Sequence, residues 1–189
     1  MLHSFHSCRP AVSFARRQFP PRRRRRSRLP EKKAFVPKPG MLLLDGIQDP
    51  GNLGTMMRTA EAAGVDGVIM SRDTVDIYNP KTIRSTMGSI YRVPFLYTDD
   101  LLADMEKLHE KGIVTYAAHL KGKGYYDEVS YKGPTAFLIG NEGNGLSDEI
   151  SEKAKQYIKI PMEGQLESLN AAVAAAILMY EAAAQRRKA

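Results

Sequence analysis

The chain has 189 residues and a single cysteine, Cys8, which excludes an intrachain disulfide and a zinc site built from clustered cysteines. Hydrophobic residues make up 43% of it, enough to bury the core of one soluble domain, and no apolar run is long enough to span a bilayer. The net charge of +7 is uneven: residues 1–40 hold nine Arg, three Lys and one Glu and carry +11, so residues 41–189 carry −4.

Residues 1–40 are predicted to be a disordered basic tail. They are rich in proline, contain the run Arg22–Arg26 and lack helical or strand periodicity. Such a tail binds phosphate backbones by releasing counterions, without reading sequence. The Arg- and Ser-rich residues 1–30 also have features of a mitochondrial transit peptide, although Pro20-Pro21 and the arginine run fit it poorly. We therefore expect a cytoplasmic protein, with a mitochondrial location as the alternative.

Beyond the tail, the sequence predicts strands that alternate with helices. Residues 41–44 form a short apolar run typical of a buried parallel strand. Asn52 is expected to cap a helix over residues 53–63 that stops at Gly64. Further strands are predicted at 68–70, 93–96, 113–117, 136–139 and 157–160, and further helices at about 99–110 and 168–187.

This alternation predicts one α/β domain over residues 41–189, with a mainly parallel sheet flanked by helices. Ligands bind such sheets beyond the carboxyl ends of the strands. Three loops that leave predicted strand ends have unusual chemistry: 46–52, 140–147 and 161–170. We expect the functional site there.

The first loop continues into a helix that carries Arg58. On a helical wheel, Arg58 points away from the apolar face formed by Leu53, Met56, Met57, Ala60 and Ala63. The periodicity alone favours a solvated arginine, with Asn52 as a simple cap.

The second loop, Gly140-Asn141-Glu142-Gly143-Asn144-Gly145-Leu146-Ser147, combines three glycines with one carboxylate. Its glycines allow close backbone approach to a ligand. Their spacing is the reverse of the dinucleotide fingerprint and no P-loop lysine follows, which argues against a dinucleotide-dependent oxidoreductase or a nucleotide hydrolase. The alternative is a plain glycine-rich turn with an exposed glutamate.

The third loop leads into the final helix through Ser168 and Asn170. Ser168 is a candidate helix cap, whereas Asn170 within the first turn is harder to explain, because asparagine is a mediocre helix former. The alanines at 171, 172, 174, 175 and 176 suit tight helix packing, either within the chain or across a dimer.

In this order and spacing, the three loops resemble the SpoU/TrmH family of RNA methyltransferases over about residues 41–187. Motif 1 resembles residues 49–58 with Gly51-Asn52-x-Gly54 and Arg58. Motif 2 resembles residues 140–147, and motif 3 resembles Ile160-Pro161-Met162 followed by Ser168-Leu169-Asn170. The chain departs from the family in having Ala172 where many members carry a second serine, and an arginine-rich tail where most carry an RNA-binding domain.

The resemblance implies a deep trefoil knot in the C-terminal part of the sheet, with S-adenosylmethionine held among the knotted loops. The implied cofactor-binding residues are Gly140, Gly145, Ile160, Met162 and Leu169. It also implies a homodimer, and RNA as the partner: ribosomal RNA first and transfer RNA second.

The implied reaction is methyl transfer to a ribose 2′-hydroxyl. No metal is expected, because the sulfonium methyl is already a strong electrophile. Arg58 would activate the hydroxyl by binding phosphate, since its pKa above roughly 12 makes it a poor resting base. Asn52, Glu142, Ser168 and Asn170 would position Arg58 and the ribose. Two alternatives are a base-modifying enzyme and a non-catalytic RNA-binding or ribosome-associated module on the same fold.

Overall fold

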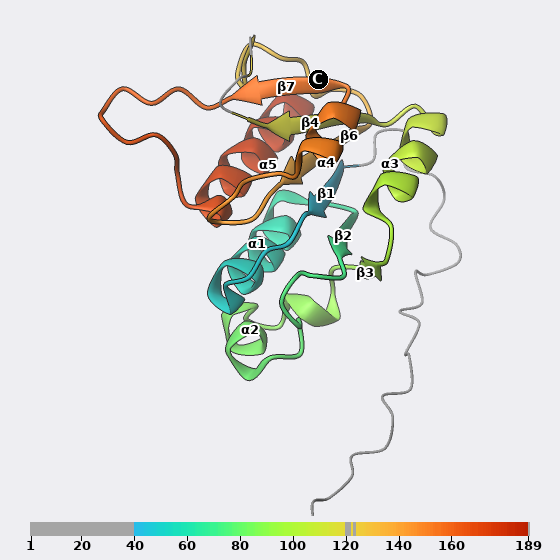
Figure 1. Cartoon of the computed structure of the whole chain (residues 1–189), viewed down its shortest axis with the longest axis vertical. Helices are drawn as coiled ribbons and strands as arrows, with labels where there is room; N and C mark the ends of the chain where they lie inside the picture. The colour runs from blue at the N-terminus through green and yellow to red at the C-terminus, as the bar shows by residue number, and fades with distance from the viewer. Residues whose placement is uncertain (1–39, 120–121, 123, 189) are drawn as a thin grey trace, which may run out of the picture.

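The computed structural model describes residues 40–119, 122 and 124–188 (Figure 1). The tail predicted for residues 1–40 lies outside the described residues, apart from Gly40, which begins the first strand. Within the described part, no helix is long and apolar enough to cross a membrane.

Seven strands form one sheet in the order β3-β2-β1-β6-β4-β7-β5, and every neighbouring pair is parallel. The mainly parallel sheet predicted from the sequence is therefore confirmed. The late strand β6 lies between β1 and β4, with Phe137 in register with both Leu42 and Tyr116. The strands are β1 (Gly40–Leu44), β2 (Gly67–Ser71), β3 (Phe95–Thr98), β4 (Val114–Ala118), β5 (Gly124–Tyr125), β6 (Thr135–Ile139) and β7 (Gln156–Lys159).

Helices cover both faces of the sheet, because alternate residues of each strand point to opposite faces. Leu42 and Leu44 belong to one apolar cluster with the buried residues of α1 and α5, while Leu43 belongs to a second cluster with those of α3 and α4. Figure 1 shows α1 and α5 together on one side of the sheet. The helices are α1 (Pro50–Ala63), α2 (Pro80–Ser85), the 3₁₀ turn η1 (Ser89–Tyr91), α3 (Leu101–Glu110), α4 (Asp148–Lys153) and α5 (Ala171–Arg187).

Two helices that border the predicted loops, α1 and α5, begin differently from the sequence prediction. Helix α1 begins at Pro50 and is capped by Asp49, whose Oδ1 accepts a hydrogen bond of 2.8 Å from the backbone N–H of Asn52. The prediction that Asn52 caps this helix was wrong, because proline is well suited to the first helical position and moves the start upstream. Its predicted end at Gly64 is confirmed, with a left-handed φ of 74°.

Helix α5 begins at Ala171, and its cap is Asn170 rather than Ser168. Asn170 Oδ1 accepts hydrogen bonds from the backbone N–H groups of Ala172 at 2.9 Å and Val173 at 3.2 Å. This explains an asparagine at the start of an alanine-rich helix. Ala172 and Ala175 are buried in the same cluster as Met56 of α1, so these small residues serve packing within the chain.

The short elements α2, η1 and β5 were not predicted from the sequence. The strand predicted at 93–96 lies two residues later, as β3. Val93 is instead buried directly after η1 and donates a backbone hydrogen bond to Ser89.

Candidate functional site

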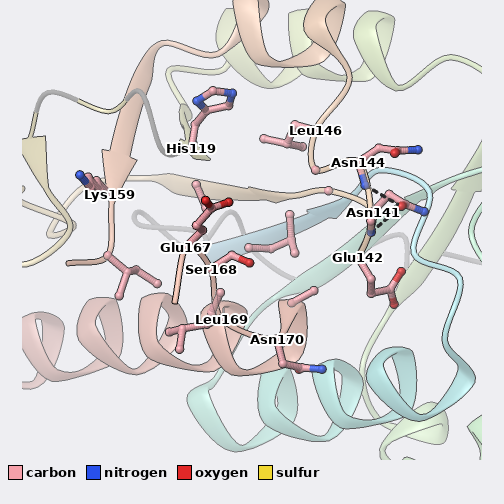
Figure 2. Close-up of a pocket in the computed structure, with 18 of the residues that line it drawn as sticks. His119, Asn141, Glu142, Asn144, Leu146, Lys159, Glu167, Ser168, Leu169 and Asn170 are labelled. Atoms are coloured by element: carbon pink, nitrogen blue, oxygen red, sulfur yellow. Dashed lines mark hydrogen bonds between the residues drawn. The ribbon is translucent and has the colours of Figure 1, made fainter. Parts of the chain in front are cut away.

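A cavity of about 620 Å³ opens beyond the carboxyl ends of β4, β6 and β7 (Figure 2). The five residues predicted to bind a cofactor all line it: Gly140, Gly145, Ile160, Met162 and Leu169. Three of the predicted catalytic residues, Glu142, Ser168 and Asn170, also line it. Segments that follow β6 and β7 thus form one concave site.

Glu142 joins the second loop to the start of α1. Its Oε2 accepts a hydrogen bond of 3.0 Å from the backbone N–H of Gln48. Its Oε1 accepts one of 3.1 Å from the N–H of Asp49 and one of 2.9 Å from Asn52 Nδ2. The side-chain partner of this carboxylate is therefore Asn52 and not Arg58.

The pKa of Glu142 lies below its ordinary value of 4.5. Partial burial alone would raise this pKa, but hydrogen bonds from the Asn52 side chain and from backbone N–H groups favour the ionised form and outweigh it. The carboxylate is therefore charged at neutral pH and holds the first turn of α1 in place.

Asn52 continues the connection to the third loop. Its Oδ1 accepts a hydrogen bond of 3.0 Å from Asn170 Nδ2, while its Nδ2 donates to Glu142. One asparagine thus uses both ends of its amide to join two loops that are 118 and 90 residues away along the chain. Glu142 and Asn170 line the cavity and are labelled in Figure 2, and Asn52 joins them from α1.

The second loop is folded tightly upon itself. The backbones of Asn141 and Gly145 exchange two hydrogen bonds of 2.9 Å, and Gly145 has a left-handed φ of 73°. A Cβ on Gly140 would lie 2.1 Å from the backbone carbon of Gly145. Ser147 then donates two hydrogen bonds to Asp45 at the end of β1. These contacts give the floor of the cavity a fixed shape.

Arg58 lies apart from this network. It is exposed on α1, six residues after Asn52, and it does not line the cavity. Its side chain has no hydrogen-bond or ion-pair partner among the described residues. Ser168 lines the cavity and is exposed.

Several residues of the site were not predicted from the sequence. His119, Lys159 and Glu167 line the cavity, and the first two directly follow β4 and end β7. For His119 and Lys159, the position at the end of a parallel strand is a signal that would have identified them. Gln48 and Asp49 were also missed as backbone partners of Glu142, because backbone donors leave no signature in side-chain identity.

Glu142→Gln should destabilise the fold by about 1 kcal/mol at pH 7. Both carboxylate oxygens of Glu142 accept hydrogen bonds from N–H groups, and glutamine would replace one of these oxygens with an NH₂ group that cannot accept. Since the folded-state pKa is lowered, the stabilisation by the carboxylate is complete above pH 4.5 and is lost as pH falls through the lowered pKa. Urea unfolding at pH 7 and at acid pH should show the difference between parent and variant shrinking. Glu152→Gln, an exposed position on α4, is the control. A pH-independent difference would contradict this role of the charge.

The chain matches a known protein family and curated relatives. A model of the SpoU rRNA Methylase family matches residues 39–180. The 23S rRNA (guanosine(2553)-2′-O)-methyltransferase RlmP of Bacillus subtilis is 41% identical over 152 residues, which cover 80% of this chain and 60% of that protein. The chain thus spans less than two thirds of that relative.

Solved structures agree with this comparison. The SpoU methyltransferase AviRb of Streptomyces viridochromogenes, in complex with the cofactor AdoMet, superposes with a TM-score of 0.77 at 32% identity. The match covers 85% of this chain and 62% of AviRb. A second solved structure, reported for the 2-OH methylation of C/U34 on tRNA, superposes with a TM-score of 0.74 at 29% identity. The match covers 81% of this chain and 99% of that protein. With the family model matching most of the chain, this protein belongs to the SpoU rRNA Methylase family.

Proposed function

We propose that this chain is an S-adenosylmethionine-dependent RNA methyltransferase that acts on a ribose 2′-hydroxyl. The observation that carries the proposal is the Glu142–Asn52–Asn170 network at the mouth of the 620 Å³ cavity. The name of the Bacillus subtilis relative, a ribose 2′-O-methyltransferase, supports the reaction type.

The cavity suits a cofactor that contains a nucleoside and an amino acid. Gly140 packs directly against the backbone of residues 145–146, where any Cβ would collide, so only glycine allows this tight loop at the floor of the cavity. Backbone groups at Gly140, Ile160 and Leu169 would hold the adenine and the methionine part through N–H and C=O groups. Polar side chains of His119, Lys159 and Glu167 lie in the same cavity and can face the charged groups. When bound, the cofactor supplies an electrophilic methyl group.

The chain's own residues would orient the ribose and bind the adjacent phosphate. The side-chain amides of Asn52 and Asn170 are hydrogen-bonded to each other, and the charged Glu142 fixes Asn52. These two amides are therefore already in position when a substrate binds. Orientation is a large part of catalysis when a hydroxyl must approach in line with the bond that breaks. Arg58 would bind phosphate and lower the pKa of the hydroxyl.

Because Arg58 is exposed and outside the cavity of its own chain, we propose that it completes the site of a second copy in a homodimer. Helices α1 and α5 pack together, and each keeps one exposed face. On α5 this face carries Val173 and Tyr180, each 47% exposed and two helical turns apart. A self-complementary apolar stripe of this kind suits a twofold interface.

The dimer predicts that Tyr180→Asp yields a monomer, because the introduced charge would be buried against its symmetry mate. Light scattering at micromolar concentration should give twice the chain mass for the parent and the chain mass for the variant. Tyr125→Asp, a tyrosine of similar exposure on β5, should leave the mass of the parent unchanged. A monomeric parent would remove the basis for a shared site.

The target that we propose is ribosomal RNA, with transfer RNA second, and the proposed location is the cytoplasm.

We also propose that the segments after β6 and β7 form the trefoil knot. The insertion of β6 between β1 and β4 and the shared cavity of both segments support it.

Mass spectrometry of total RNA from a strain lacking this gene tests the function. We expect the loss of one 2′-O-methyl nucleotide and its restoration by purified protein with S-adenosylmethionine. Unchanged RNA together with no cofactor binding by calorimetry would favour the non-catalytic RNA-binding module instead.

A further inference from the structure

A second surface, beside the cavity, exposes aromatic and aliphatic side chains that a soluble domain ordinarily buries. It consists of Tyr78, Ile83, Met87 and Tyr91 together with the bases Lys81 and Arg84, and we call it the Tyr91 surface. Tyr91 is 85% exposed, Met87 69% and Tyr78 61%. Such a concentration of exposed apolar residues in one short segment marks an interaction site.

The charge of this segment indicates an anionic partner. Residues 78–92 contain three bases and no acid, whereas residues 41–189 as a whole carry −4. Among the described residues, Arg84 has no ion-pair partner. Lys81 pairs with Asp49 and Arg92 with Glu61. Aromatic rings interleaved with cations form the combination that binds single-stranded nucleic acid, with bases stacked on the rings and phosphates near the cations.

The segment is held rigidly although it is exposed. Glu61 of α1 accepts a hydrogen bond of 2.5 Å from Ser89 Oγ and pairs with the Arg92 guanidinium, so it clamps both ends of η1. The Arg92 and Ser89 contacts lower the pKa of Glu61 to about 2, so the clamp persists at every physiological pH. Tyr91, between these two residues, is therefore presented to solvent on a fixed backbone.

Met87 adds an independent sign of function. It is the one described non-glycine residue with a positive φ, 49°, and the next residue, Gly88, has a φ of 89°. A long side chain in the left-handed region is unfavourable, and at 69% exposure Met87 gains little packing to offset the strain. Folding alone would favour glycine or asparagine there.

The Tyr91 surface borders the proposed catalytic site. Lys81 Nζ lies 3.3 Å from Oδ2 of Asp49, whose backbone N–H donates to Glu142. Helix α2 packs closely on α1, since a Cβ on Gly54 would lie 2.3 Å from Ser85 Cβ. An RNA strand bound to this surface would therefore lie next to the first turn of α1, which carries Asn52.

We propose that the Tyr91 surface binds the unpaired nucleotides that flank the methylated ribose: Tyr78 and Tyr91 stack on bases, Met87 contacts a base face, and Lys81 and Arg84 bind phosphates. This inference rests on the proposed function for the identity of the ligand. It assigns substrate positioning to the catalytic domain itself, in addition to any contribution of the basic residues 1–40.

Fluorescence anisotropy of the full chain with a short fluorescein-labelled oligouridylate tests the proposal. At high salt, where binding through the basic tail is weakened, Tyr91→Ala should reduce affinity about tenfold, because the stacking of one base is lost. Tyr91→Phe keeps the ring and should bind as the parent does. Tyr125→Ala, at the opposite edge of the sheet, should also bind as the parent does. Arg84→Ala should flatten the salt dependence.

Equal affinities of Tyr91→Ala and Tyr125→Ala would overturn the proposal, as would a changed mass of Tyr91→Ala in light scattering, which would make the surface an interface between copies of the chain. Photocrosslinking with 5-iodouridine should modify the peptide that contains Tyr91 in the parent, and crosslinks confined to the basic tail would contradict the assignment. Neither assay requires methyl transfer. An inactive parent that still binds through Tyr91 would therefore refute the enzyme and not this surface.

Discussion

Arg58→Ala is expected to reduce methyl transfer about 10³-fold while leaving the fold and cofactor binding intact, because one preorganised donor contributes on that order to a developing oxyanion. The side chain is exposed and lies outside the cavity, so its removal costs neither core packing nor a contact with the cofactor. Single-turnover methylation of RNA, thermal unfolding and calorimetry with S-adenosylmethionine measure the three quantities separately.

Two further variants define the role of this arginine. Arg58→Lys should not restore the rate, since lysine lacks the planar fork that grips a phosphate. Arg72→Ala removes another exposed arginine, after β2, and should behave as the parent does. Parental activity of Arg58→Ala would refute the assignment and leave the simple solvated arginine that the helical periodicity favours.

Gly140→Ala is expected to destroy cofactor binding and to destabilise the fold by about 3 kcal/mol or more, as severe overpacking does. Its Cβ would lie 2.1 Å from both the carbon of Gly145 and the nitrogen of Leu146, and backbone cannot rotate away as a flexible side chain does. The loop between β6 and α4 must therefore open, and the cavity loses its floor. Urea unfolding and calorimetry with S-adenosylmethionine give the two effects.

Gly143→Ala is the matched control in the same loop. A Cβ at that position meets only Asn141 Oδ1, at 3.5 Å, which is an ordinary contact. We expect its stability and cofactor affinity to be close to those of the parent. If both alanine variants bound the cofactor equally, the close crossing at Gly140 would not be what shapes the pocket.

Arg58→Ala and Gly140→Ala together also test whether the site is shared between two subunits. When Arg58→Ala and Gly140→Ala chains are mixed, a dimer that combines an intact arginine from one chain with an intact pocket from the other should recover part of the activity. No recovery from verified mixed dimers would place Arg58 in the same subunit as its cofactor.

The sequence predicted the parts of this fold that rest on strong local signals. The apolar runs that became β1, β2 and β6 were found because strands covered on both faces are continuously hydrophobic. The short elements α2 and η1 were missed, since a single helical turn has too few residues to show a period. The starts of α1 and α5 were misplaced because Asp49, Asn52, Ser168 and Asn170 are all capable caps, and tertiary contacts decide among them.

For the site, side-chain chemistry was easier to predict than geometry. The segments that contain Glu142 and Asn170 were singled out as chemically odd, and the structure gives each of them a partner at Asn52. The sequence could not show that Arg58 stands apart from that network, because helical phase gives direction but not the distance to another loop. The backbone donors of Gln48 and Asp49 were equally invisible.

The sheet order sets the sequence of events in folding. Strand β6 must enter between β1 and β4, two strands synthesised before it, so the middle of the sheet cannot close until residue 139 is available. Asn170 then joins Asn52 across 118 residues. Pairings of such sequence separation are slow to form, because the entropy of closing long loops is lost before any contact is gained. A nascent chain therefore has an open half-sheet with a hydrophobic edge until β6 emerges, and we expect it to be prone to aggregation during that interval.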